Sequence, residues 1–415
     1  MAVATPSVTD QLVAARRAAR KLARLDRGTK DAALHAIAGA LERRSAEILE
    51  ANARDMEAGR ENDLTAALLD RLRLDEQRIA AIAAQVRDIA ALPDPVGEVV
   101  DGQRLANGLS LRRVRVPLGV VGVVYEARPN VTIDAAALCL KSGNAIVLRG
   151  SSSAAHSNEV LARIAGEASG LPEGAVTLLG GGRESLAELA TADGLVDLVI
   201  PRGGEGLKKA LEAVATVPVI YAASGNCHVY VDASADLDAA EEIVVNAKTQ
   251  RPGVCNAAET LLVHVDAAPR FVPRVARRLA AEGVELRLDG RARTLAGDGH
   301  AEATDEDWAT EYLDLTLAVG VVDSLEEAID HVNRHGSGHS EAIVTGDVAA
   351  AREFQLGVDA ACVYVNASTR FTDGAEFGMG AEIGNSTQKL HARGPIGLRE
   401  LCAYKYLVEG AGHVR

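Results

Sequence analysis

The chain has 415 residues, a length that predicts two or three domains. Its 44 Lys and Arg against 58 Asp and Glu leave a net charge of −14, which disfavours general binding to nucleic acid or to an anionic membrane. Aromatic residues make up 3% of the chain, too few for stacking on nucleic-acid bases to be a main activity. An anionic small molecule remains compatible as a substrate, where Arg, Lys, His and backbone N–H groups gather locally.

The cysteines and the N-terminal residues indicate a cellular compartment. The five cysteines are an odd number, widely spaced and without a C-x-x-C pair, so they fit a reducing cytosol better than a disulfide framework. The first residues contain no apolar stretch typical of a secretory signal, and no run of about 18 apolar residues predicts a membrane span. We therefore expect a cytoplasmic protein without a membrane segment.

The first part of the chain predicts helices followed by a β-hairpin. Apolar residues recur at spacings of three and four across residues 8–92, as in amphipathic helices. Asn107-Gly108 is typical of a two-residue turn between the strand-like runs of residues 98–117. The continuously apolar run that follows, residues 119–126, predicts a strand buried on both faces.

From there strands and helices alternate, which predicts a parallel, doubly wound sheet. The strands of a first block are expected at residues 145–150, 175–182, 195–204, 218–223 and 228–232. A second α/β domain is expected from about residue 236, with strands at residues 260–265, 284–290, 315–322 and 340–346. Residues 398–410 predict a closing strand.

Three turns after predicted strands are rich in small residues: "LRGSSS", "LLGGGR" and "IPRGGEG". Such turns direct backbone N–H groups and helix N-termini towards a ligand, typically a phosphate. None of them has the G-x-G-x-x-G spacing of the usual dinucleotide-binding fingerprint. The pattern alone leaves two interpretations open, a phosphate site and a set of tight turns.

The stretch "TQRPGVCNAAET" places Cys255 in a loop between a predicted helix and a predicted strand. Lys248 and Arg251 are nearby cations, which lower the pKa of a thiol, and Asn256 and its neighbours offer N–H donors to an oxyanion. Locally, a nucleophile and a small packing residue are both compatible with Cys255. Packing is expected for the other four cysteines, Cys139, Cys227, Cys362 and Cys402.

Two other kinds of site have little support. His331, His335 and His339 are spaced by four, but the first is not followed by the pattern of an H-E-x-x-H zinc helix, and Gly336 interrupts the helix before His339. We expect no metal site. No G-x-S-x-G elbow predicts a serine hydrolase, whereas a cysteine hydrolase using Cys255 stays open.

Four segments resemble a known family. "VPLGVVGVVYEARPNVTIDAAALCLKSGNAIVLRG" and "QRPGVCNAAET" resemble the aldehyde dehydrogenase superfamily. "EEAIDHVNRHGSGHSEAIVT" and "GAEFGMGAEIGNSTQKLHARGPIGLREL" are similar to its γ-glutamyl phosphate reductases, also called glutamate-5-semialdehyde dehydrogenases. The resemblance spans nearly the whole chain, and the last two segments are long and specific.

The resemblance implies an aldehyde dehydrogenase-like α/β fold of two doubly wound domains and a small hairpin element. The NADP(H)-binding domain would comprise residues 1–97 and 118–235, and the catalytic domain residues 236–385. Residues 98–117 and 386–415 would form an oligomerisation element that extends a partner's sheet, giving a dimer or tetramer. Ligands would bind between the domains, at the carboxyl ends of the strands.

The resemblance also implies a chemistry. The Cys255 thiolate would displace phosphate from γ-glutamyl phosphate, and a hydride from NADPH would convert the thioester into glutamate-5-semialdehyde, on the route to proline. Asn130 and the Cys255 N–H would stabilise the oxyanion. A transient complex with the glutamate 5-kinase that makes the unstable substrate is compatible with this chemistry.

Further site residues follow from positions in the family's motifs. The cofactor contacts implied are Arg149, Gly150, Ser151, Ser152, Ser153, Pro201, Arg202, Gly203, Gly204, Gly206 and Glu311. The substrate carries a phosphate, a carboxylate and an ammonium group, for which the expected contacts are Arg251, His339, Ser340, Glu341 and Arg370.

The chain departs from the superfamily's pattern in two places. Aldehyde-oxidising relatives carry a glutamate roughly thirty residues before the cysteine, and the corresponding "AASGNCHVYVD" lacks it. Because such a glutamate activates water against a thioester, its absence favours reduction over oxidation to an acid. At "VLRGSSS", where relatives often have Lys-Pro, an arginine and hydroxyls suit the 2′-phosphate of NADP.

Overall fold

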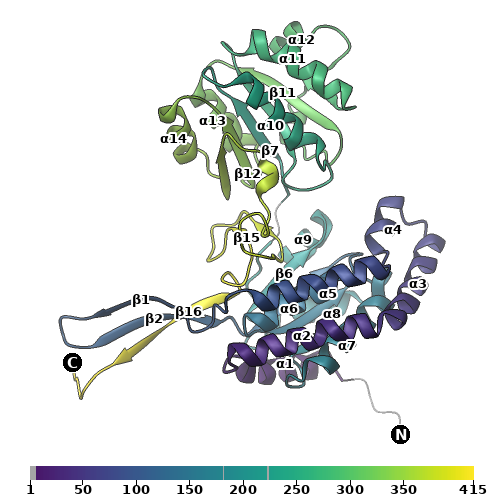
Figure 1. The fold of residues 1–415 in the computed structure, drawn as a ribbon, viewed down its shortest axis with the longest axis vertical. Helices are drawn as coiled ribbons and strands as arrows, with labels where there is room; N and C mark the ends of the chain where they lie inside the picture. Colours follow the sequence, from purple (N-terminus) through teal and green to yellow (C-terminus); the bar gives the residue numbers. More distant parts are fainter. Residues whose placement is uncertain (1–5, 181, 222–223) are drawn as a thin grey trace. The chain divides into compact units, whose positions relative to one another are not determined.

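The computed structural model describes residues 6–180, 182–221 and 224–415, which divide into two compact units. Unit 1 contains the chain up to Tyr221 together with Met379–Gly384 and Ile396–Arg415. Unit 2 contains the chain from there to Gly378, together with Asn385–Pro395. Figure 1 draws both as layered arrangements of helices and strands.

Unit 1 begins with helices, as the spacing of apolar residues predicts. They are α1 (Val8–Leu22), α2 (Arg27–Arg43), α3 (Ser45–Glu61), α4 (Ala66–Leu72) and α5 (Glu76–Ala91). Side chains that accept a backbone N–H fix four of the starting points: Ser7, Asp26, Thr65 and Asp75. No helix among the described residues of the chain is long and apolar enough to cross a bilayer.

The sheet of unit 1 has four parallel strands in the order β5-β4-β3-β6. The strands are β3 (Val120–Tyr125), β4 (Ala145–Gly150), β5 (Val176–Leu178) and β6 (Leu198–Arg202). All residues of β3 are buried, as expected for a central strand covered on both faces. The helices of this part are α6 (Asn130–Lys141), η1 (Ser152–Ala154), α7 (Ala155–Ser169), α8 (Arg183–Ala190) and α9 (Glu205–Glu212).

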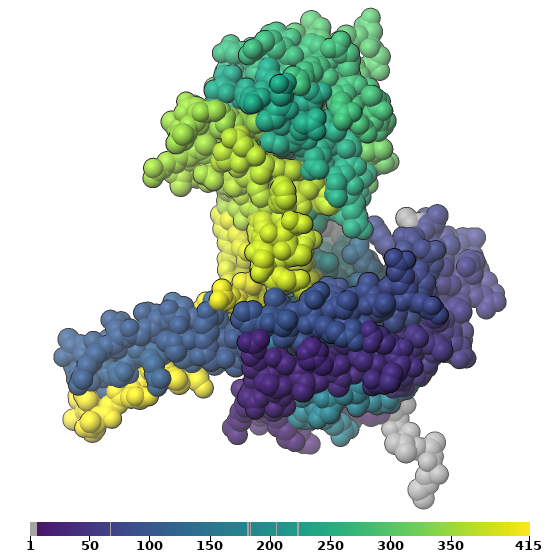
Figure 2. All heavy atoms as spheres, viewed as in Figure 1, coloured from purple at the N-terminus to yellow at the C-terminus, as the bar shows by residue number. Residues whose placement is uncertain are grey.

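A three-stranded antiparallel arm extends from unit 1 (Figures 1 and 2). It consists of β1 (Val99–Arg104), β2 (Ser110–Pro117) and the C-terminal β16 (Cys402–Glu409), with β2 in the centre. Every residue of β1 is exposed, and Tyr404 lies between the guanidinium groups of Arg113 and Arg115, each 5.0 Å from the ring centre.

The hairpin turn is one residue longer than the Asn107-Gly108 pair predicts. The Leu105 N–H bonds to the Leu109 carbonyl at 2.8 Å, and the Gly108 N–H bonds back to the Leu105 carbonyl at 2.8 Å. Three residues therefore form the loop, with Gly108 at a φ of +89°. This is the common three-residue turn with a glycine in the left-handed region.

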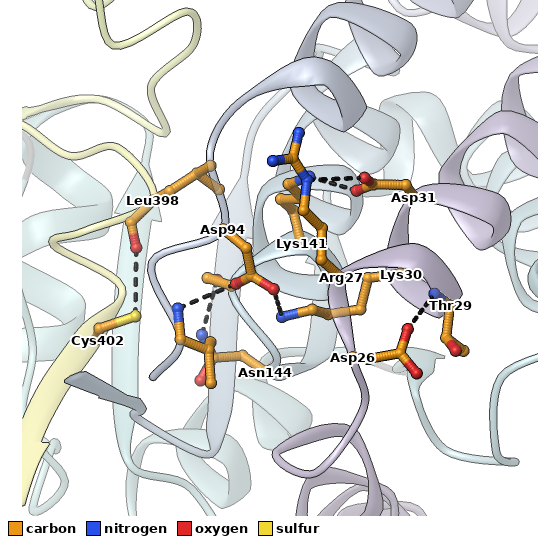
Figure 3. A network of polar contacts seen from close by, with 12 residues as sticks. Asp26, Arg27, Thr29, Lys30, Asp31, Asp94, Lys141, Asn144, Leu398 and Cys402 are labelled. Carbon is orange, nitrogen blue, oxygen red and sulfur yellow. Dashed lines mark hydrogen bonds and ion pairs between the residues drawn. The ribbon is translucent and has the colours of Figure 1, made fainter. Parts of the chain in front are cut away.

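Buried ion pairs join α2, α6 and the segment that leads to the arm (Figure 3). Lys141 is fully buried and binds Asp31, and it also donates to the Ala90 carbonyl at 2.6 Å. Lys30, equally buried, lies 2.6 Å from the carboxylate of Asp94. Because a buried ammonium is costly without a partner, these pairs fix how the helices pack.

Unit 2 is built on seven parallel strands in the order β10-β9-β11-β8-β7-β12-β13. They are β7 (Cys227–Val231), β8 (Ala258–His264), β9 (Glu285–Leu288), β10 (Ala301–Glu302), β11 (Thr316–Val322), β12 (Ser340–Val344) and β13 (Cys362–Val365). A short antiparallel pair, β14 (Asn385–Ser386) and β15 (Gly394–Pro395), also belongs to this unit.

Two apolar cores cover the two faces of this sheet. One lies under α10 (Leu237–Thr249), α11 (Ala268–Ala281) and α12 (Gly290–Ala296). The other lies under α13 (Leu325–His335) and α14 (Val348–Gly357), which Figure 1 shows on the opposite side. Two short turns, η2 (Asp307–Ala309) and η3 (Thr369–Phe371), complete the unit. The doubly wound α/β prediction is confirmed.

The units do not follow the domain boundaries expected from the resemblance. β7 falls in the segment assigned to the cofactor domain, but it pairs with β8 and β12 in the sheet of unit 2. Residues 385–395, expected mostly with the arm, group with unit 2. The alternation of strands and helices is uniform through this region, so it does not indicate which sheet a strand joins.

The strand predicted at residues 218–223 is largely wrong. Val219 forms a single bridge with Val199 of β6, and residues 222 and 223 lie outside the described residues. Pro218 has no N–H to donate, which limits ladder pairing at this edge.

We predict that Asp31→Ala lowers the free energy of unfolding of unit 1 by about 3–5 kcal/mol, because it leaves Lys141 buried without its carboxylate. Glu42→Ala is the matched control, since Glu42 pairs with Arg87 at the surface and we expect its loss to have little effect. Urea denaturation measures both. Equal effects of the two substitutions would contradict a structural role for the buried pair.

Candidate functional site

The residues of unit 1 that are expected to hold a cofactor meet at one edge of its sheet, whereas Glu311 belongs to unit 2. β3, β4 and β6 are adjacent and parallel, so the segments that follow them leave from the same edge. The register aligns Tyr125 with Gly150 on one side and with Arg202 on the other. The structure thus brings Asn130, residues 149–153 and residues 201–206 to a single edge, at the carboxyl ends of the strands as predicted for this half.

The turn after β6 has the shape of a cradle for an anion. A Cβ on Gly203 would lie 2.7 Å from the carboxylate of Glu126, whereas one on Gly204 or Gly206 would meet nothing within 4 Å. The open side of the turn is therefore lined by backbone at the start of α9, where helix N–H groups favour negative charge. The Gly204 N–H is already engaged, donating to Glu126 at 3.0 Å.

The turn after β4 supplies polar groups of matching chemistry. The Ser151 hydroxyl accepts the Ala127 N–H at 3.1 Å and lies 2.6 Å from the Ser153 hydroxyl. Arg149 donates to the Gly182 carbonyl at 3.1 Å through Nη2, while its Nε has no hydrogen-bond partner among the described residues. A guanidinium, hydroxyls and open glycine backbone are a donor set that fits phosphate groups.

Asn130 starts α6 directly after this edge. Its Nδ2 donates to the Asp134 carboxylate at 2.9 Å, one helical turn further on. Burial raises the pKa of Asp134 to about 6, although the Asn130 hydrogen bond and the charge of Arg202 both lower it.

In unit 2, Cys255 lies in the loop between α10 and β8, at the amino end of its strand. The carboxyl-end prediction is therefore wrong for this half. α10 runs back along the sheet and ends where β8 begins, so a loop of this kind reaches the amino edge. Cys255 is partly exposed, while the other four cysteines are buried as predicted.

The backbone of Gly225 packs directly against Cys255. A Cβ on Gly225 would lie 1.4 Å from the Cys255 carbonyl oxygen, so no other residue fits. The same carbonyl lies 3.2 Å from the Cys227 thiol, which donates to it. Glu311 accepts the Gly225 N–H at 2.6 Å, which gives the expected cofactor ligand a role in holding this backbone.

One of the expected substrate residues, Arg370, lies near the thiol, and Arg251 lies near Arg370. Arg370 lies close enough to interact with the charge of Cys255, and its Nε donates to Gln250 at 2.8 Å. Burial, and then the charge of the exposed Arg251, lower the pKa of the Arg370 guanidinium. A guanidinium beside a cysteine favours the thiolate.

The side-chain amide of Asn256 is not available as an oxyanion donor. Its buried amide donates to the carbonyls of Thr372, at 2.9 Å, and Arg370, at 3.3 Å. The backbone carbonyl of Asn256 accepts the Thr369 hydroxyl at 2.7 Å. The side chain ties the cysteine loop to η3 instead.

Lys248 is not a free cation beside the thiol. It is fully buried and lies 2.5 Å from the equally buried carboxylate of Glu259. Burial raises the pKa of Glu259 to about 7 and lowers that of Lys248. The pair joins α10 to β8 in the interior, and Arg370 is the cation whose charge interacts with that of Cys255.

The three remaining substrate candidates are buried, and they separate in space. His339 lies 2.7 Å from the Ser340 hydroxyl, which continues to Thr372 at 2.5 Å and to Tyr364, a further 2.7 Å on. Because side chains alternate along a strand, Glu341 points to the opposite face. It accepts the His228 N–H at 2.6 Å, and burial raises its pKa well above the usual range. Glu341 therefore does not offer a carboxylate to a substrate ammonium in this structure.

The histidines of α13 pack against other rings. His331 stacks edge-on against His228, Trp308 and, tilted, His335, with ring centres 4.7–5.4 Å apart. Among the residues that the structure describes, no three His, Cys, Asp or Glu side chains are arranged to hold a metal ion. Burial lowers the pKa of His331 to about 3 and that of His228 to about 4, so both are neutral near pH 7.

Two contributors to the site were absent from the sequence-based expectations: Gly225 and Asp134. Asp134 could have been identified from the sequence, since its spacing of four from Asn130 places both residues on one helix face. Gly225 makes a contact thirty residues along the chain, which no local pattern reveals.

Gly225→Ala should displace Cys255 and strongly slow its alkylation by iodoacetamide, because the added methyl group overlaps the cysteine carbonyl. Gly166→Ala is the control. Gly166 lies inside α7 with nothing within 4 Å of an added Cβ, so we expect unchanged alkylation and a gain of about 0.5–1 kcal/mol in stability. Alkylation of Gly225→Ala at the native rate would show that the loop adapts.

The buried histidines of unit 2 should lower its stability as the pH falls from about 6.5 to 4, and the raised pKa values of Glu259 and Glu341 oppose this contribution. The pKa values of His228, His331 and His339 lie at about 4, 3 and 4, below the ordinary 6.5, because these side chains are buried. The unfolded chain therefore binds more protons in this window, and each such histidine adds up to about 1.4 kcal/mol per pH unit to the slope.

The fluorescence of Trp308, the one tryptophan of the chain, measures this unfolding in urea because its ring packs on His331. His331→Gln should flatten the dependence on pH, while His35→Gln, at an exposed position on α2, should not. The same slope in all three proteins would contradict the assignment of neutral buried histidines.

Comparison with known proteins agrees with this arrangement. The aldehyde dehydrogenase family model matches residues 2–293 and 316–405. A γ-glutamyl phosphate reductase of Moorella thermoacetica is 59% identical over 97% of both chains, and one of Thermobifida fusca is 57% identical over 97% of both. The crystal structure of a γ-glutamyl phosphate reductase from Thermotoga maritima is 46% identical, covers 99% of this chain and 100% of its own, and superposes with a TM-score of 0.97. The chain belongs to the aldehyde dehydrogenase family and groups with its γ-glutamyl phosphate reductases.

Proposed function

We propose that the protein reduces γ-glutamyl 5-phosphate to glutamate-5-semialdehyde and phosphate with NADPH, in the cytoplasm, as a step of proline biosynthesis. The observation that carries this proposal is the setting of Cys255. It is the one cysteine of the five that is not buried, and a partly buried guanidinium lies beside it. Relatives above 50% identity that carry the reductase name support the substrate.

Cys255 acts as the nucleophile. Its thiolate attacks the acyl carbon, the carbon–sulfur bond forms, and the carbon–oxygen bond to phosphate breaks, which leaves an acyl thioester and free phosphate. Arg370 stabilises the thiolate before attack, and with Arg251 it offers positive charge to the departing phosphate. Asn130 and the Cys255 N–H donate to the oxygen that carries negative charge during attack.

The groups around the thiol disfavour hydrolysis of the thioester. The segment that begins β7 lacks the glutamate of aldehyde-oxidising relatives. Glu259 and Glu341, the carboxylates whose charges act on the neighbouring Cys227, are both fully buried and engaged. Neither can activate a water molecule at Cys255, so the thioester persists until it is reduced.

The carboxyl edge of the unit 1 sheet would hold the cofactor. The open turn of Gly204 and Gly206 fits a diphosphate, and Arg149 with Ser151 to Ser153 suits a 2′-phosphate, which favours NADPH over NADH. When bound there, NADPH supplies the hydride that reduces the thioester. Glu311 remains a candidate cofactor contact.

The arm is proposed as the contact between copies of the chain. β1 and β16 are its outer strands, and each has an unpaired edge within the described arm. Its exposed apolar side chains include Val99, Tyr404, Tyr406 and Val408. Edge strands of this kind add to a neighbouring sheet. A homodimer or homotetramer follows, and transient contact with the upstream kinase would shorten the exposure of the acyl phosphate to water.

The reverse reaction tests the function. The purified protein should oxidise glutamate-5-semialdehyde with NADP+ only when phosphate is present, because phosphate must displace the acyl group from Cys255. Cys255→Ala should lower kcat by at least about 10⁴-fold, as loss of a nucleophile does. Cys139→Ala, a buried position on α6, should retain full activity.

Two results would refute the proposal. Activity without phosphate would indicate an ordinary aldehyde dehydrogenase. Absence of any change in NADPH fluorescence on titration with the protein, together with cysteine-dependent ester cleavage, would indicate a cysteine hydrolase.

A further inference from the structure

We propose that Asp134 is a positioning residue that fixes the orientation of the Asn130 amide for the oxyanion. The inference rests on the proposed function, in which Asn130 donates to the reacting oxygen. Asp134 itself touches neither substrate nor cofactor in this assignment.

The geometry of α6 supports this role. Asn130 is the first residue of the helix and Asp134 lies one turn further, so their side chains share a face. The distance from Asn130 Nδ2 to Asp134 Oδ2 is 2.9 Å, a normal hydrogen bond. The other carboxylate oxygen, Oδ1, is buried and has no hydrogen-bond partner among the described residues. The bond to Asn130 is therefore the one described contact that satisfies this carboxylate.

The chemistry of the two groups sets the direction of the amide. An ionised carboxylate only accepts hydrogen bonds, so it binds the NH₂ end of Asn130 and rejects the carbonyl end. The amide nitrogen carries two hydrogens. One points to Asp134, and the second is left with a fixed direction. An asparagine without such a partner rotates and can present either end to the site.

The Asp134 carboxylate also interacts with the charge of a residue at the end of β6. The charge of Arg202, at the end of β6, favours the ionised form of Asp134. The ionised form has no O–H to donate, so it excludes the carbonyl end of the Asn130 amide. Asn130, Asp134 and Arg202 thus link the start of α6 with the turn of Gly203 and Gly204.

A double-mutant cycle tests the inference. Asn130→Ala should lower kcat by about 10²–10³-fold, as removal of an oxyanion donor does. Asp134→Ala should lower kcat by about tenfold or more, with little change in KM or in the Kd for NADPH, because a misdirected donor costs transition-state binding. Asp134→Asn keeps an acceptor oxygen at the same place and should stay within about threefold of the native kcat.

The decisive measurement is Asp134→Ala in the Asn130→Ala background. There it should change kcat by less than about twofold, because no amide remains to be positioned. A purely structural role would give the same loss in both backgrounds and would overturn the inference. Thermal unfolding of each variant identifies loss of folding, and Asp134→Asn, with nearly the native shape, keeps the test open if Asp134→Ala does not fold.

Failure of this inference is distinct from failure of the proposed function. Full activity of Asn130→Ala would remove the oxyanion role and overturn the inference, while phosphate dependence and inactive Cys255→Ala would still support the reductase. Native kcat in Asp134→Ala, with Asn130→Ala impaired, would overturn the inference alone.

Discussion

The close approach of two backbone segments determines where the Cys255 thiol lies. Gly225, just before β7, lies so near Cys255 that an added methyl carbon would be 1.4 Å from the cysteine carbonyl. Glu311 binds the N–H of that glycine, and the Cys227 thiol donates to the same carbonyl. Asn256 then ties the loop to η3, which carries Arg370. The position of Arg370 relative to the Cys255 thiol therefore depends on a backbone contact at Gly225, a residue without a side chain.

Much of the fold could be predicted because its causes are local. The spacing of apolar residues determined the helices before β3, and the uninterrupted apolar run of β3 identified a strand covered on both faces. The glycine turns after β4 and β6 were recognisable, and the parallel pairing of these strands with β3 brings them together. Which sheet a strand joins depends on pairing partners distant in the sequence. β7 belongs to the sheet of unit 2 because it pairs with β8 and β12.

The site was harder to predict because the sequence shows its polar and charged residues but not their ion-pair and hydrogen-bond partners. Lys248 lies seven residues before Cys255 in the sequence, but in the structure it forms a buried ion pair with Glu259. Glu341 is beside Ser340 in sequence and on the other face in space, where it binds the His228 N–H. Asn256 follows the cysteine, yet its side-chain amide donates to the backbone carbonyls of Arg370 and Thr372. In each case a contact distant in the sequence decides whether a polar group remains free for chemistry.

The arm has a stability profile of its own. At its base, Asn144 donates to the Leu401 carbonyl and accepts the Gly119 N–H, so the strands are anchored in unit 1. Towards the turn at Leu105–Leu109, both faces of a three-stranded sheet meet solvent, and little apolar area is removed from water. Its backbone amides consequently open without global unfolding, and exchange with deuterium should quicken from base to tip. A partner strand along either edge would reverse that gradient, which makes the rigidity of the arm a function of protein concentration.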